Sequence, residues 1–165
     1  MKLVDLNEAL KEKQPGTYVA VKFSGETIKS FEDFIKKHDI PNPTPSDEFH
    51  CTVIYSRKHC DGFKPDGELV KPWIGKPTKL EIFKTRNEDK ETNCLVIRFD
   101  CDELVKRHEY IMDEYDATYD FPEYKIHTSL SYDCGDFDPK SIKNIDDEIG
   151  EIEIVEEYME ELRDF

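Results

Sequence analysis

The chain has 165 residues, a net charge of −15 and a hydrophobic fraction of 37%, with 12% aromatic residues. This composition favours one folded domain over a disordered chain, and no apolar run reaches the roughly 18 residues of a membrane-spanning helix. The charge argues against a long nucleic acid as the main partner, because such affinity needs many basic contacts. The charge does not exclude a small phosphate-bearing ligand, since one local basic pocket can hold it.

The first residues, MKLVDLNEALKEKQPG, lack the apolar region of a secretory signal, so we expect a cytoplasmic protein without membrane contact. Five cysteines occur without a CxxC pair, and we expect all five to be free thiols. His50 and Cys51 are adjacent, but neighbouring strand residues point to opposite faces and cannot share a metal. The sequence therefore predicts no metal site and no cofactor, and it leaves the oligomeric state open.

The first half of the chain predicts a strand, a helix and a second strand. Thr17–Phe23 alternates apolar and polar residues and is rich in β-formers, which indicates a strand. Ser24 is a typical N-cap for a helix that runs to about His38. The proline-rich segment Pro41–Pro45 ends helical structure, and Phe49–Ser56 is the next expected strand.

The second half predicts the same order. Cys94–Phe99 is an expected strand, and Asp100 with Glu103 forms a capping-box pattern for a helix to about Tyr115. Tyr124–Tyr132 is the following strand. Two further strands are expected, Lys79–Lys84 and Glu151–Glu157.

One numerical offset superposes the two halves. His127 follows His50 by 77 positions, and Ser129 follows Thr52 by the same interval. The pairs Tyr55 and Tyr132, and Pro45 and Pro122, share this offset, while Lys22 and Arg98 are 76 apart. Matching elements at one offset indicate an internal repeat. We expect a single domain over residues 1–165 with lobe-forming repeats at about 17–56 and 93–133.

The tripeptides HCT and HTS place a histidine and a hydroxyl two positions apart, so both project from one face of a strand. The histidine of a single such tripeptide is usually a half-buried structural residue of a strand. Two copies at matched points of a repeat favour catalysis instead. One imidazole can take a proton from an attacking oxygen, while the other protonates the leaving oxygen. The hydroxyls can stabilise charge on the phosphate oxygens. The expected catalytic residues are His50, Thr52, His127 and Ser129.

FHCTVIYS and IHTSLSY resemble the paired His-x-Thr/Ser motifs of the 2H phosphoesterase superfamily. With YVAVKF near the start, the chain looks most like the phage anti-CBASS nucleases, which degrade the cyclic oligonucleotide messengers of bacterial antiviral signalling. The resemblance implies an α+β fold of two pseudo-symmetric lobes, each an antiparallel sheet with outer helices, around a central cleft. It also implies metal-independent hydrolysis of 3′-5′ bonds in small cyclic nucleotides in the host cytoplasm. The alternatives are an RNA 2′,3′-cyclic phosphodiesterase and a module that sequesters a cyclic nucleotide.

Five further residues are candidates for substrate binding. Trp73 stands in an expected loop, where it either stacks on a base or fills the edge of the core. Tyr18 and Lys22 share one strand face, which either lines the cleft or is an ordinary open face. Glu123 and Glu156 could accept hydrogen bonds from base amino groups, although most glutamates of so acidic a chain are solvated.

Overall fold

The structure, a computed structural model, describes residues 14–163. Six antiparallel strands form one sheet in the order β2-β1-β6-β3-β4-β5. The strands are β1 (Gly16–Phe23), β2 (Cys51–Ser56), β3 (Gly67–Asn87), β4 (Lys90–Asp100), β5 (His127–Ser131) and β6 (Ile152–Leu162). The helices are α2 (Gly25–Lys37), α3 (Asp102–Glu114) and α4 (Ile145–Glu148), with short 3₁₀ turns at Ser46–Glu48 and Pro139–Ser141. The α+β class predicted from the sequence is confirmed.

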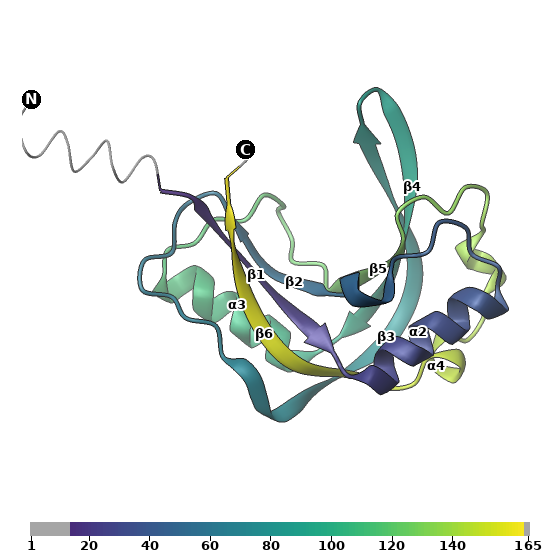
Figure 1. Cartoon of the computed structure of the whole chain (residues 1–165), viewed down its shortest axis with the longest axis horizontal. Helices are drawn as coiled ribbons and strands as arrows, with labels where there is room; N and C mark the ends of the chain where they lie inside the picture. The colour runs from purple at the N-terminus through teal and green to yellow at the C-terminus, as the bar shows by residue number, and fades with distance from the viewer. Residues whose placement is uncertain (1–13, 164–165) are drawn as a thin grey trace, which may run out of the picture.

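The sheet has two equivalent halves, β2-β1-β6 and β5-β4-β3, joined through the long strand β3 (Figure 1). The first part of β3 pairs with β6, and residues from Lys76 onward pair with β4. The expected order of strand, helix and strand is present twice, as β1-α2-β2 and β4-α3-β5. Both histidine strands, β2 and β5, are therefore edge strands, and the outer ends of β3 and β4 form a hairpin that stands away from the body (Figure 1).

The helix signals were accurate in one half and partly wrong in the other. Ser24 caps α2, and its side chain accepts a hydrogen bond from the backbone N–H of Thr27 at 3.2 Å. The capping box expected at Asp100 and Glu103 is wrong, because Asp100 still belongs to β4. Cys101 is the N-cap of α3, and its side chain makes no capping hydrogen bond within the described part of the chain.

The core lies between the sheet and the helices. Phe31 of α2 packs edge-on against Phe23 of β1, with ring centroids 5.4 Å apart, and contacts Phe49 at 5.3 Å. Leu104 and Ile111 of α3 are fully buried on the same side of the sheet. Each such side chain contributes about 1.5–3 kcal/mol when removed from water. Burial of one face leaves the opposite face of the sheet free to carry the motif side chains.

Helix α3 follows β4 in the chain but packs beneath the other half of the sheet. His108 of α3 lies within hydrogen-bond distance of the Val53 carbonyl in β2, and Arg107 pairs with Glu157 of β6. The two repeats are thus interlocked, because the helix of the second repeat packs against strands β2 and β6. Within residues 14–163, no helix is long and apolar enough to cross a membrane.

Candidate active site

The two histidines lie at corresponding ends of the two edge strands. His50 directly precedes β2, and His127 is the first residue of β5. The sheet curls so that these edges meet: the backbone of His127 lies beside the Cys51 thiol, and the Tyr124 hydroxyl donates to the Thr52 carbonyl at 2.7 Å (Figure 1). The charge of His50 also acts on His127. The fold therefore brings the two motifs together where the edge strands β2 and β5 meet.

Both imidazoles are held in the same way by the backbone two residues earlier. The Nδ1 atom of His50 lies 2.7 Å from the Glu48 carbonyl, and that of His127 lies 2.6 Å from the Lys125 carbonyl. A carbonyl oxygen can only accept, so each Nδ1 carries a proton. Each Nε2 is then the ring nitrogen left to accept or donate a proton, which is an arrangement suited to acid–base chemistry.

The surroundings of His127 favour its neutral form. Burial lowers its pKa, and the nearby charges of Arg98 and His50 lower it further. The hydrogen bond to the Lys125 carbonyl and the charge of Glu81 oppose this shift without cancelling it. The ring of Phe83 packs edge-on against the imidazole, with centroids 4.8 Å apart. A neutral imidazole with a free Nε2 is suited to accept a proton.

Each motif hydroxyl has a partner that can act as donor. The Tyr18 hydroxyl lies 2.8 Å from Thr52 Oγ1, and the Cys94 thiol lies 3.3 Å from Ser129 Oγ. Burial raises the pKa of both Tyr18 and Cys94, so both keep their protons at neutral pH. When Tyr18 and Cys94 donate, the hydrogens of Thr52 and Ser129 are free for phosphate oxygens.

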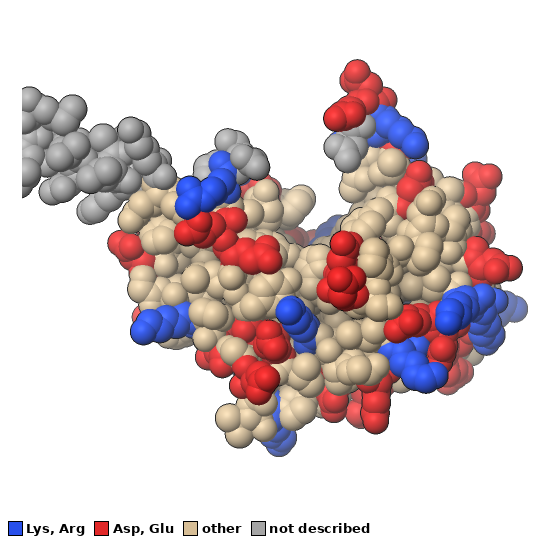
Figure 2. Space-filling view, in the orientation of Figure 1, with Lys and Arg blue, Asp and Glu red and all other residues tan. Residues whose placement is uncertain are grey.

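An open pocket of about 600 Å³ adjoins His50. Its walls include Tyr18, Lys22, His50, Tyr55, Tyr132 and Tyr158. The Lys22 ammonium lies 5.1 Å from the centre of the Tyr158 ring and 3.9 Å from a carboxylate oxygen of Glu156. The pocket thus offers aromatic surfaces with one cation, and the acidic residues Asp47, Glu48 and Glu160 also line it. The view in Figure 2 shows acidic side chains, with some basic ones, on a largely uncharged surface that is hollowed beside the raised hairpin.

The sequence reasoning missed Tyr55 and Tyr132 as lining residues. Each histidine strand contains a β-bulge, with Val53 as the extra residue in β2 and Leu130 as the extra residue in β5. The extra residue reverses the alternation, so the tyrosine three positions after the hydroxyl residue returns to the face of that hydroxyl. The two bulges are 77 positions apart and match in the repeat. A second pocket, of about 640 Å³, shares Tyr132 with the first.

Three of the expected substrate-binding residues have other surroundings. Trp73 does not lie in a loop: it belongs to β3, pairs with Ile154 and is partly buried against the core. Glu123 is exposed and lines neither of the two pockets. Glu156 pairs with Lys22 across β1 and β6, beside the first pocket but outside its lining. Within the described residues, no three His, Cys, Asp or Glu side chains cluster as metal ligands.

A family model described as "Anti-CBASS protein Acb1" matches residues 15–164. The chain is 36% identical over 135 residues to the anti-CBASS protein Acb1 of Acinetobacter phage Ac42, covering 82% of this chain and 80% of that protein. Its match to the anti-CBASS protein Acb1 of Enterobacteria phage T4 is 33% identical and covers 76% and 77%. Among solved structures, apo E. coli LigT has a TM-score of 0.51 over 90% of this chain and 88% of LigT, at 13% identity. That likeness concerns the fold alone.

Proposed function

The chain belongs to the anti-CBASS protein Acb1 family, and from this premise we propose that it hydrolyses 3′-5′ bonds of cyclic di- and oligonucleotide messengers. The reaction needs no metal, because side chains supply a proton acceptor, a proton donor and hydrogen bonds for the phosphate. The observation that carries the proposal is the matched pair of histidines, each with Nδ1 bonded to a backbone carbonyl and Nε2 left for substrate.

In the proposed mechanism, His127 is the general base and His50 the general acid. The Nε2 atom of His127 takes the proton of a ribose 2′-hydroxyl, whose oxygen attacks the phosphorus. The bond from phosphorus to the 5′-oxygen breaks, and protonated His50 delivers its Nε2 proton to that oxygen. The first product is a linear nucleotide with a 2′,3′-cyclic phosphate. Water then opens this phosphate with the histidine roles reversed, so the proton balance closes.

The two hydroxyls stabilise the charge that develops on the non-bridging oxygens. Thr52 and Ser129 donate to these oxygens. The hydroxyl of Thr52 accepts from Tyr18, and the hydroxyl of Ser129 accepts from the Cys94 thiol. Loss of one such donor to a developing oxyanion typically lowers kcat by about 10²–10³-fold. Bases of the substrate stack on the tyrosines of the pocket, since each flat aromatic contact contributes about 1–3 kcal/mol.

A metal-free assay tests the proposal. The protein is incubated with cyclic GMP-AMP in EDTA, and linear products are separated by chromatography. We expect turnover in EDTA, and losses of about 10³-fold or more in His50→Ala and His127→Ala, because each removes one half of the acid–base pair. The matched control is His59→Ala, which lies outside the site with Nδ1 at 3.1 Å from the Pro15 carbonyl and should keep the full rate.

Four outcomes contradict the proposal. Loss of turnover in EDTA would refute the metal-free mechanism, and a full rate in either active-site variant would refute the residue roles. Binding of cyclic GMP-AMP without cleavage would favour a sequestering module. An oligonucleotide ending in a 2′,3′-cyclic phosphate is the second substrate, and cleavage of it alone would favour an RNA-end phosphodiesterase. The acidic surface argues against that alternative, since RNA binding benefits from a basic rim.

A further inference from the structure

The two β-bulges beside the motif residues are held by side chains and backbone from outside the sheet ladder. In β2, the Thr52 carbonyl accepts from the Tyr124 hydroxyl at 2.7 Å. The next carbonyl, of Val53, accepts from His108 Nδ1 at 2.7 Å. Burial lowers the pKa of His108, so a neutral ring with one N–H is committed to this bond. Both carbonyls at the bulge are therefore satisfied.

The bulge in β5 is held by one residue. The Ser129 carbonyl accepts from the Thr44 hydroxyl at 2.8 Å, and the Leu130 carbonyl accepts from the Thr44 backbone N–H at 2.9 Å. The bonded carbonyls of the two strands correspond by the 77-residue offset of the repeat. The donors cross over: Thr44 belongs to the first repeat and holds the second histidine strand, while Tyr124 and His108 belong to the second repeat and hold the first.

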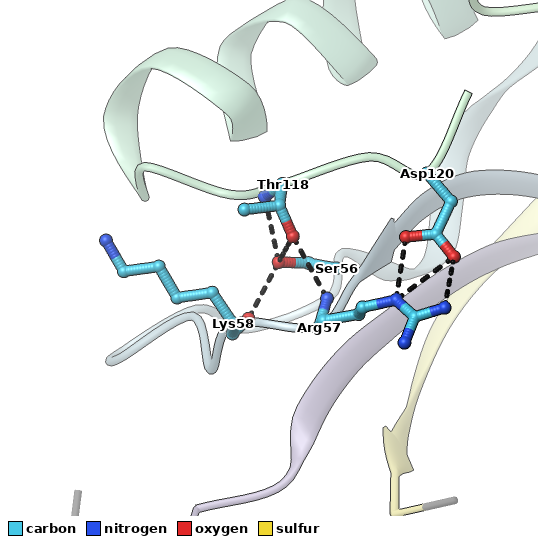
Figure 3. Close-up of polar contacts among 5 residues, drawn as sticks. All are labelled: Ser56, Arg57, Lys58, Thr118 and Asp120. Carbon is cyan, nitrogen blue, oxygen red and sulfur yellow. Dashed lines mark hydrogen bonds and ion pairs between the residues drawn. The ribbon is translucent and has the colours of Figure 1, made fainter. Parts of the chain in front are cut away.

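Further contacts fix the donor segments in place. Figure 3 shows the end of β2 bound to the segment before Tyr124: Ser56 Oγ accepts from the Thr118 N–H at 2.9 Å, and Arg57 forms a bidentate pair with Asp120. On the opposite side, the Ser131 hydroxyl donates to the Pro41 carbonyl at 2.6 Å. Each donor segment is thus anchored along the strand that it supports.

We propose that Tyr124 and Thr44 are reciprocal positioning residues, each holding the bulge that aims the motif side chains of the opposite repeat. The inference rests on the proposed function for its kinetic consequence. A β-bulge re-aims side chains, and a carbonyl that loses its partner lets the local backbone relax. A displacement of about 1 Å at a reacting group can lower the rate by about 10²-fold. The two bulges are the points at which that displacement would start.

Kinetics test this role in four variants. Tyr124→Phe keeps the ring and removes the hydroxyl, and Thr44→Val removes the Thr44 hydroxyl alone. We expect kcat for cyclic GMP-AMP to fall about tenfold or more in each, with KM within about twofold, because the pocket walls remain. Two controls should keep kcat. Tyr119→Phe removes a hydroxyl from the same aromatic cluster, and the centroid of the Tyr119 ring is 5.9 Å from that of Tyr124. Thr44→Ser retains both bonds to β5.

A second measurement needs no substrate and separates this inference from the proposed function. Nuclear magnetic resonance follows the imidazole signals of His50 and His127 in the full chain during a pH titration. We expect a crossed pattern, in which Tyr124→Phe shifts the signals of His50 and Thr44→Val shifts those of His127. Shifts confined to the histidine of the same repeat, or equal shifts in Tyr119→Phe, would overturn the inference. A wild-type chain that cleaves nothing but shows the crossed pattern would refute the function and leave the positioning intact.

Discussion

The ion pair between Arg107 and Glu157 ties α3 to β6 and offers a quantitative test of the fold that supports the site. Arg107 donates from Nε and Nη2 to the two carboxylate oxygens of Glu157, each at 2.8 Å. The backbone N–H of Asp66 donates to the same carboxylate at 2.8 Å. The Glu157 side chain is inaccessible to solvent, and Arg107 is 16% exposed. Arg107→Met removes both guanidinium bonds and leaves the carboxylate in the core with one donor.

The expected cost follows from that geometry. Removing one member of a buried pair typically destabilises a protein by about 3–5 kcal/mol, because the remaining charge is uncompensated. For a domain of this size each kcal/mol lowers Tm by about 2–4 °C, so we expect a decrease of about 6–20 °C. Replacing both partners, in Arg107→Met/Glu157→Met, removes the buried charge altogether. Its stability should return to within about 1–2 kcal/mol of wild type, since the Asp66 N–H loses its acceptor.

Urea unfolding followed by circular dichroism gives the free energies. The control is Lys29→Met, which breaks an exposed pair on α2 with Lys29 Nζ 3.5 Å from the Asp33 carboxylate. Exposed pairs at this spacing contribute about 0.3–0.5 kcal/mol. If Arg107→Met lowers the free energy of unfolding no more than the control does, the ion pair does not anchor α3 to β6. The same conclusion follows if the double variant is as unstable as the single one.

Three other predictions concern the site. Arg98→Gln removes a cation that lowers the pKa of His127, so this pKa should rise. His127 is then protonated at higher pH, and the acidic limb of the pH profile of kcat/KM should shift to higher pH. Tyr18→Phe removes the donor to Thr52, so kcat should fall about tenfold in steady-state assays with little change in Tm. Thr128→Val replaces a buried hydroxyl that has no hydrogen-bond partner among the described residues, so urea unfolding should show equal or greater stability, by up to about 1 kcal/mol, with kcat unchanged.

The sequence was sufficient for the features that local pattern and the repeat determine. Ser24 and the apolar stripe after it predicted α2 to within one residue at each end. The 77-residue offset predicted that both histidine motifs would occupy equivalent strands, and β2 and β5 are the two edges of the sheet. These inferences need only residue spacing, which a single sequence contains.

Features that depend on pairing between strands were not predictable. A period of two puts Tyr55 on the face opposite Thr52, and only the register of β2 against β1 reveals the extra residue at Val53. Trp73 stood among prolines that suggested a loop. In the fold, Pro72 lies in the unpaired stretch between Glu68 and Trp73, where its missing N–H costs no ladder bond, so β3 continues through it.

The repeat sets the geometry of the site, and its departures from symmetry set the chemistry. Two identical histidines would titrate alike, whereas phosphodiester cleavage needs one neutral and one protonated imidazole at the same moment. The equivalent cations Lys22 and Arg98 have different surroundings. Lys22 lies over the Tyr158 ring in the wall of the open pocket, while Arg98 lies near His127 and lowers its pKa. Phe83 covers His127 as well. Burial and positive charge lower the pKa of His127, which suits this imidazole to accept a proton, although both motif histidines are held alike by backbone carbonyls.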